Sequence, residues 1–145
     1  MRGVAMQAQT EKMEKGEFLG DYRSKIVTTT LKEISPSGIR MEQNDQGEIT
    51  GKYNGRHLGT VTLLSKPDGT VEWESKAMQT TEEGDTLFYL GSGTGRSKAK
   101  PATWTGELTC MTQSPRLAWL NNAKVHIEGT TDQATGEIRG KAYTK

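Results

Sequence analysis

The feature that most constrains this chain is a run of short segments in which apolar and polar residues alternate, separated by glycine and Asx turn signals. Residues 70–78 are typical: one side has Val71, Trp73, Ser75 and Ala77 and the other has Glu72, Glu74 and Lys76, the period of two that a half-buried strand shows. The pattern predicts an all-β fold, a single antiparallel, roughly eight-stranded barrel, closed or nearly closed. We expect residues 16–145 to form it and residues 1–15 to be a flexible tail or a short helix.

Composition supports one domain with a thin or partly polar core. The chain has 145 residues, of which 32% are hydrophobic and 17 are glycine. This length is that of one domain, and the low apolar fraction is unusual for a densely filled interior. A barrel whose lumen carries polar groups fits both observations.

Charge and hydropathy exclude several classes of partner. The formal net charge is +1, from 19 basic and 18 acidic residues, so we expect neither nucleic acid nor a membrane surface as a partner. No apolar run has the length of a membrane helix, and residues 1–15 hold no apolar core of the kind found in signal peptides. With a single cysteine, Cys110, the default expectation is a cytoplasmic protein.

Turn signals divide the chain into its expected elements. Asn54-Gly55 is a tight-hairpin dipeptide, residues 44–47 indicate a turn after a short strand, and the glycine-rich stretch 91–101 indicates a loop. Ser114-Pro115 indicates the start of one helical turn reaching Leu120. Residues 86–90 are apolar on both faces, which favours a strand at a subunit interface and hence a homo-oligomer, a dimer or trimer.

No motif of catalysis or metal binding stands out. His57 and His126 are the only histidines, and neither has further ligands at metal-site spacing, so we expect no metal and no cofactor. The pattern predicts that His57 is a solvated loop residue and that His126 faces outward. Glu72 and Glu74 are expected on a solvated strand face.

The aromatic residues are the better candidates for a site. Trp73, Tyr89 and Trp104, with Cys110 on the same strand face as Trp104, are expected to line a lumen and contact a ligand there. Glycines inside strand-like runs would let the sheet close or leave room for that ligand; they are Gly51, Gly106, Gly129 and Gly140.

Four segments give the chain a resemblance to a known family: residues 91–96, 104–106, 117–121 and 136–143. Their glycine and aromatic placements resemble the C-terminal half of small bacterial proteins with the allene oxide cyclase-like, calycin-like barrel. The resemblance covers roughly the last sixty residues and implies an eight-stranded antiparallel barrel and frequent dimers or trimers. It also implies a cavity, which in the plant enzymes cyclises an oxidised fatty acid. No segment matches the plant enzymes' substrate-positioning residues, so no catalytic role is carried over.

Three functions follow as hypotheses. The first is a barrel that binds a small hydrophobic or amphipathic molecule among its aromatic residues. The second is a cyclase or isomerase that folds a reactive lipid-like or polyketide-like substrate, which requires an acid or base inside the lumen. The third is a structural or oligomeric module without a ligand.

Overall fold

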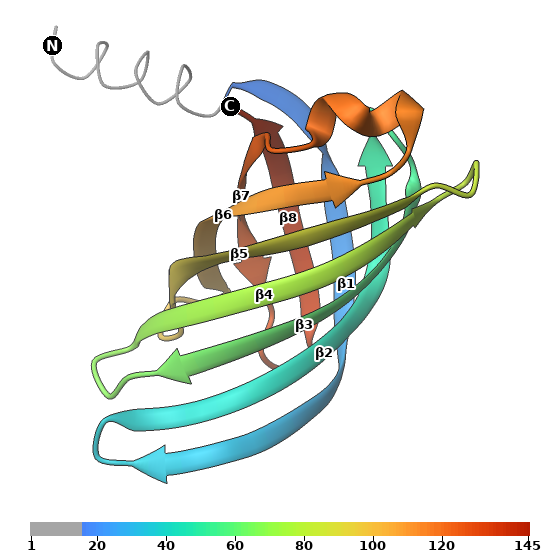
Figure 1. Cartoon of the computed structure of the whole chain (residues 1–145). Helices are drawn as coiled ribbons and strands as arrows, with labels where there is room; N and C mark the ends of the chain where they lie inside the picture. The colour runs from blue at the N-terminus through green and yellow to red at the C-terminus, as the bar shows by residue number, and fades with distance from the viewer. Residues whose placement is uncertain (1–15) are drawn as a thin grey trace, which may run out of the picture.

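The chain forms a closed antiparallel β-barrel of eight strands, in which each strand pairs with the next and β8 returns to β1 (Figure 1). This computed structural model describes residues 16–145, and the tail or helix expected over residues 1–15 lies outside the described residues. The strands are β1 (Glu17–Ser35), β2 (Gly38–Gly51), β3 (Gly55–Ser65), β4 (Thr70–Thr81), β5 (Thr86–Arg96), β6 (Ala102–Thr112), β7 (Lys124–Thr131) and β8 (Glu137–Thr144). The predicted fold class is confirmed.

Two predicted interruptions are absent from the strands. Residues 91–96, expected as part of a loop, continue β5 and pair with β4 and β6. Residues 44–47, expected as a turn, lie in the middle of β2. Glycine-rich and Asx-rich segments favour turns in isolation, but here the neighbouring strands on both sides satisfy their backbone groups. The loop prediction is correct only for residues 97–101.

One end of the barrel is closed by the short 3₁₀ helix η1 (Pro115–Leu120), which begins at the predicted proline. Its Leu117 and Leu120 are buried in the main hydrophobic cluster together with residues from the nearby strand ends, which are Leu19, Ile49, Tyr53, Leu87, Tyr89, Cys110, Val125 and Ala142. This cluster fills the end of the barrel that η1 covers.

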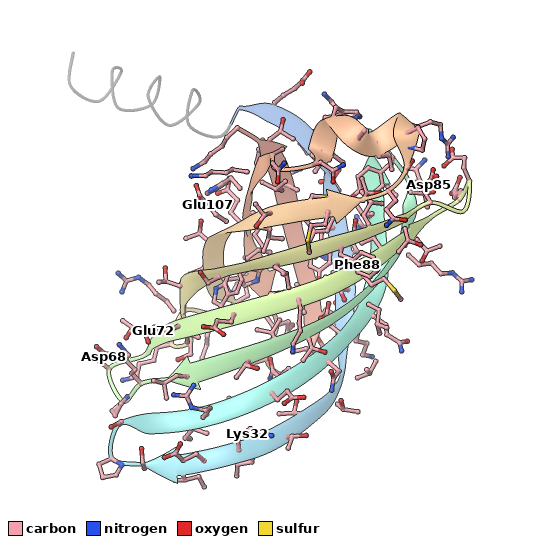
Figure 2. All side chains as sticks on the ribbon, in the orientation of Figure 1. Lys32, Asp68, Glu72, Asp85, Phe88 and Glu107 are labelled. Atoms are coloured by element: carbon pink, nitrogen blue, oxygen red, sulfur yellow. The ribbon has the colours of Figure 1, made fainter. Side chains whose placement is uncertain are left out.

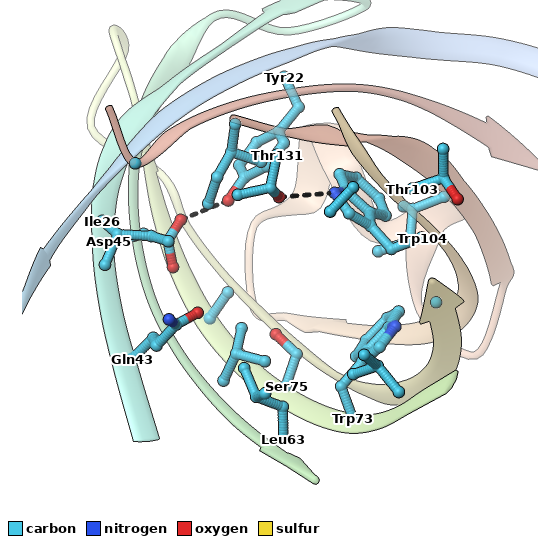
Figure 3. A pocket seen from close by; sticks show the side chains of 18 of the residues that line it. Tyr22, Ile26, Gln43, Asp45, Leu63, Trp73, Ser75, Thr103, Trp104 and Thr131 are labelled. Carbon is cyan, nitrogen blue, oxygen red and sulfur yellow. Dashed lines mark hydrogen bonds between the residues drawn. The ribbon is translucent and has the colours of Figure 1, made fainter. Parts of the chain in front are cut away.

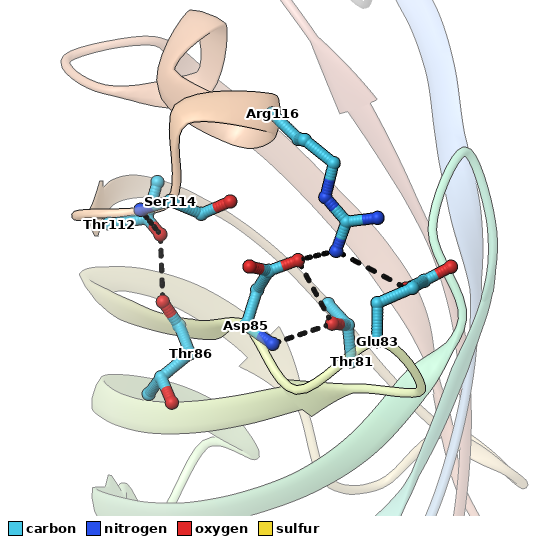
Figure 4. Close-up of polar contacts among 7 residues, drawn as sticks. All are labelled: Thr81, Glu83, Asp85, Thr86, Thr112, Ser114 and Arg116. Atoms are coloured by element: carbon cyan, nitrogen blue, oxygen red, sulfur yellow. Dashed lines mark hydrogen bonds and ion pairs between the residues drawn. The ribbon is translucent and has the colours of Figure 1, made fainter.

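Polar contacts fix η1 to the strands beneath it (Figure 4). Arg116 pairs with Asp85 in the turn between β4 and β5, and the backbone N–H of Asp85 donates to Thr81 Oγ1 at 2.9 Å. Thr112 donates to the carbonyl of Thr86 at 2.7 Å and accepts from the Ser114 backbone N–H at 3.1 Å. These contacts therefore connect η1 and the segment before it to the ends of β4, β5 and β6.

The outer surface carries a row of apolar side chains. Leu58, Met78, Phe88 and Met111 are cross-strand partners in register on β3 to β6, and each is 39–48% exposed. Phe88 projects away from the barrel in Figure 2. The residues 86–90, expected to be apolar on both faces, thus place Leu87 and Tyr89 inside and Phe88 and Leu90 outside.

Within residues 16–145, none of the helical structure has the length and apolar character needed to span a membrane.

Candidate functional site

A cavity of about 480 Å³ occupies the lumen on the side away from η1. All eight strands contribute residues to its wall, and residues 133–136, between β7 and β8, also border it. Figure 3 shows Tyr22, Asp45, Trp73 and Trp104 around this space. Cavities of this size accommodate small organic ligands.

The two tryptophans of the lumen rest on glycines. A Cβ at Gly93 or Gly106 would lie 2.4–2.5 Å from the ring of Trp73, and one at Gly129 or Gly140 would lie 2.5 Å from the ring of Trp104. These glycines therefore make room for indole rings and for the backbone of the neighbouring strand, which fits the expectation that they let the sheet close. The alternative expectation, that they leave space for a ligand, does not hold at Gly106, Gly129 and Gly140. At Gly51, a Cβ would instead meet backbone atoms of β1.

Both indole N–H groups are occupied within the protein. Trp73 donates to the Thr94 carbonyl and Trp104 donates to Thr131 Oγ1, each at 3.1 Å. The two rings meet edge to face with centroids 6.5 Å apart, and Tyr22 lies edge to face against Trp104 at the same distance. The aromatic wall is thus held rigidly by its own contacts, leaving ring surfaces for a ligand.

Deeper in the lumen, Asp45 accepts three hydrogen bonds. Ser24 Oγ donates to its Oδ2 at 2.5 Å, Tyr22 donates to the same oxygen, and His57 Nε2 lies 3.2 Å from it. Asp45 is 2% exposed and His57 9%. Tyr22, Ser24, Asp45 and His57 come from β1, β2 and β3, which are consecutive neighbours in the barrel.

The cluster continues as a hydrogen-bonded chain toward the covered end of the barrel. Gln79 Nε2 lies 3.1 Å from His57 Nδ1, and the Gln79 oxygen accepts from Tyr53. The Tyr53 and Tyr89 hydroxyls are 2.7 Å apart, and Tyr89 contacts the thiol of Cys110. Buried polar groups are thus satisfied from the middle of the lumen to its floor.

Burial and hydrogen bonding shift the acidities of these groups in opposite directions. Burial disfavours the charge on Asp45, but hydrogen bonds from His57, Ser24 and Tyr22 outweigh it and hold the pKa of this carboxyl below its ordinary value. Burial, together with the neighbouring Asp45, raises the pKa of Tyr22 well above its ordinary value. Burial also raises the pKa values of Tyr53, Tyr89 and Cys110. At neutral pH the lumen therefore holds one carboxylate among protonated phenols.

The placement of the predicted ligand-contacting residues is mixed. Trp73, Tyr89 and Trp104 line the cavity, whereas Cys110 is buried behind it in the main cluster, beside Tyr89. That these residues contact a ligand stays a prediction.

The prediction for His57 is wrong, and Asp45 was missed. His57 lies inside β3, two residues after the strand begins, with its ring in the lumen. The usable signal was parity: His57 alternates in step with Val61 and Leu63, and Asp45 with Met41 and Ile49, all of which line the cavity. Asp45 lies between the turn-forming residues Asn44 and Gly47, so the turn signal concealed its place in the strand alternation.

His126 projects from the outer side of β7, as predicted, but is partly covered. Its ring lies near Tyr143, with centroids 6.3 Å apart, and its Nε2 is 3.9 Å from Glu128. Across residues 16–145, no three side chains of His, Cys, Asp or Glu gather in a metal-binding arrangement.

The fold and the cavity define this protein as a small antiparallel β-barrel with a ligand-sized lumen. Neither the family models nor the curated proteins give a match to the chain. Among solved structures, it is similar to a protein of unknown function from Clostridium acetobutylicum, with a TM-score of 0.79 and 18% identity over 89% of this chain and 97% of the other.

Two further structures share the architecture. One is a conserved protein of unknown function from Rhodopseudomonas palustris, with a TM-score of 0.75 and 15% identity over 88% of this chain and 95% of the other. The other is an enzyme from Penicillium herquei, with a TM-score of 0.65 and 20% identity over 89% and 92% of the two chains. These likenesses show the fold alone, and the resemblance to allene oxide cyclase-like proteins stays a prediction.

Proposed function

We propose that this protein binds a small amphipathic molecule in the barrel lumen, with the apolar part against Trp73 and Trp104 and the polar part toward Tyr22 and Asp45. The observation that carries the proposal is the cavity of about 480 Å³ that joins these two surfaces. A mostly apolar pocket with a few convergent polar groups is the usual form of a small-molecule site. A module with a completely filled interior would have no such space.

The test is calorimetric titration with 2-naphthylmethanol, a flat apolar molecule with one hydroxyl. Ser75 lines the lumen on β4, so Ser75→Phe fills the cavity, whereas Glu74→Phe adds the same ring to the exposed side of the same strand. We expect saturable binding to the wild type and to Glu74→Phe, and a loss of at least ten-fold in affinity for Ser75→Phe. Equal affinity in both variants, or no binding to the wild type, contradicts the proposal.

The second candidate is a cyclase or isomerase, and the pairing of Tyr22 with Asp45 supports it because a proton donor and an ionised carboxylate stand together at the cavity wall. The similarity to a Penicillium herquei enzyme also fits this candidate. A carboxyl whose pKa is held low is a weak proton acceptor, however, so the geometry supports binding more strongly than proton transfer.

The catalytic candidate predicts proton exchange at a carbon next to a carbonyl. Asp45 would take an α-proton from 2-tetralone in D₂O, and a deuteron from solvent would return to the same carbon. NMR should show exchange faster than the buffer background in the wild type and at background rate in Asp45→Asn. Identical exchange in both proteins would exclude Asp45 as the proton acceptor for this class of substrate.

Assembly into a dimer or trimer and a cytoplasmic location are part of the same proposal. The exposed apolar row of Leu58, Met78, Phe88 and Met111 supports the first, because contiguous apolar surface of this kind favours association. The single thiol, buried at Cys110, is compatible with a reducing compartment.

A further inference from the structure

Asp45 is the one charged side chain that points into the lumen from the described strands. Two basic residues also border the cavity, but Arg96 is on an outward-facing position at the end of β5 and Lys141 extends outward to Asp21, with its Nζ 2.8 Å from Asp21 Oδ1. Neither cation is directed at Asp45. The negative charge is therefore met only by hydrogen-bond donors.

His57 lies between Gln79 and Asp45. The Gln79 oxygen accepts from Tyr53, so the Gln79 amide group that faces His57 is the NH₂, which can only donate. His57 Nδ1 is consequently the acceptor, and its Nε2 faces the Tyr22 hydroxyl at 3.1 Å and Asp45 Oδ2 at 3.2 Å.

One oxygen of the carboxylate remains available. All the hydrogen bonds to Asp45 from residues 16–145 converge on Oδ2, and none reaches Oδ1. Beside Oδ1 lies Gly59, where a Cβ would be 2.7 Å from both Oδ1 and His57 Nε2. Because glycine occupies this position of β3, the approach to Oδ1 is not blocked by a side chain.

Aromatic rings line the same cavity as the open oxygen. The Tyr22 ring lies 4.6 Å from that of His57 and 6.5 Å from that of Trp104, which in turn contacts Trp73. Figure 3 shows Tyr22, Trp104 and Trp73 on the same cavity as the Asp45 carboxylate. Tryptophan and tyrosine faces attract cations, and the attraction is stronger where water is excluded.

We propose that the lumen selects an organic cation, a protonated amine on an apolar skeleton, with its ammonium group on Asp45 Oδ1 and its carbon skeleton against Trp73 and Trp104. This inference rests on the proposed binding of a small molecule in the lumen and names the chemical class of that molecule. A buried carboxylate with one open oxygen gains most from a ligand that brings the missing positive charge.

The experiment compares three probes of the same shape by calorimetry at neutral pH and moderate salt: 2-naphthylmethylamine, 2-naphthylmethanol and 2-naphthoate. We expect the amine to bind at least ten-fold more tightly than the alcohol, and the naphthoate more weakly than either. The protein's net charge of +1 does not favour cations in general, so such a preference would come from the site.

Three variants locate the preference. Asp45→Asn should bring the amine to within two-fold of the alcohol, and Gly59→Ala should weaken the amine because the new methyl group crowds Oδ1 while the charge remains. Glu48→Gln removes one charge from the exposed face of the same strand and should leave all affinities unchanged. Circular dichroism of each variant verifies that it is folded.

The outcomes separate the two proposals. If the alcohol binds the wild type and Ser75→Phe abolishes that binding, but the amine has no advantage, the lumen is a ligand site and the cation preference is wrong. If the amine advantage survives in Asp45→Asn, the cation binds elsewhere and the inference is also wrong. If none of the three probes binds the wild type, both proposals are contradicted.

Discussion

Gly93 and Gly106 are adjacent across β5 and β6 and form the surface on which Trp73 lies. In Gly106→Ala, the new Cβ would fall 2.5 Å from the Trp73 ring and from the Ser92 carbonyl oxygen. Overpacking of this kind typically costs about 1–3 kcal/mol. We expect urea denaturation to show a loss of that size.

The matched control for this substitution is Thr105→Val, which changes an exposed residue next to Gly106 on the same strand. Its stability should stay within about 0.5 kcal/mol of the wild type, as surface changes usually do. If Gly106→Ala were as stable as Thr105→Val, the close contact between Trp73 and the glycine surface would be refuted.

Because the folded protein lowers the pKa of Asp45, this residue makes the free energy of unfolding depend on pH in the acid range. Its pKa is lower in the folded protein than its ordinary value near 4, so between these two values the unfolded state binds more protons. The contribution of Asp45 is present above about pH 4 and is lost as the pH falls through the folded-state pKa. We predict that the free energy of unfolding declines more steeply below pH 4 in the wild type than in Asp45→Asn.

The exposed carboxyl of Asp68 and the partly buried carboxyl of Asp85 also have lowered pKa values, but both proteins share them, so the difference between the two denaturation series isolates Asp45. Parallel declines from pH 6 to pH 2 would show that Asp45 has no stabilising partners in the folded state.

The aromatic residues of the lumen were predictable from the sequence, but its polar centre was not. Trp73 and Trp104 lie in strands with strict alternation, which fixes the face of each residue. Asp45 and His57 follow the same rule, but a carboxylate and an imidazole are rarely buried without partners, and their partners Tyr22 and Gln79 come from β1 and β4. These contacts join residues 22 to 23 positions apart along the chain, so a local sequence pattern cannot reveal them.

The helix η1 covers one end of the barrel. Leu120 is fully buried in the cluster beneath it, and Leu117 is nearly so. Leu120→Ala should cost about 2–5 kcal/mol, because it removes buried methyl groups and leaves a cavity. Thermal or urea unfolding measures this loss.

A substitution within the same helix provides the comparison. Trp119 is 49% exposed, so Trp119→Ala should be much less damaging than Leu120→Ala. The reverse order would mean that η1 does not pack its leucines into the covered end of the barrel.

The outer row on β3 to β6 predicts self-association. We expect light scattering after size exclusion to give a mass above that of one chain, and Phe88→Lys to lower it, because a charge at the centre of the row disfavours burial. Lys76→Glu, on the outer side of β4, serves as a control that changes charge without changing apolar area. If the wild type is monomeric at high micromolar concentration, the outer row is not a subunit interface.

The short helix was predicted well from its proline, whereas the long strands that contain polar and glycine residues were predicted less well. The proline-initiated η1 appears as expected. The chain also reverses between β2 and β3, but it does so over residues 52–54, and neither Asn54 nor Gly55 has the positive φ of the predicted tight turn. Residues 91–96 resemble a loop because glycine alternates with Ser92 and Thr94. They are nevertheless strand, and the Trp73 ring occupies the space that a side chain at Gly93 would need. Tertiary packing overrides local preference at that position.

The whole molecule is a barrel with two unlike ends. The hydrophobic cluster and η1 seal one end, and the cavity occupies the remainder, with the Asp45 cluster between them and the tryptophans farther from the seal. The buried apolar side chains that stabilise the fold gather at the sealed end, so the rest of the lumen can contain a carboxylate and open space. Closure of the barrel was predictable from even strand spacing, whereas this division was not, because it depends on how side chains from eight strands fill one interior.

The most direct test is a crystal structure of the protein with 2-naphthylmethylamine. We expect electron density for the naphthalene beside Trp73 and Trp104, and the ammonium nitrogen about 3 Å from Asp45 Oδ1. A lumen closed by its own side chains, or an amine bound only on the outer surface, would contradict it.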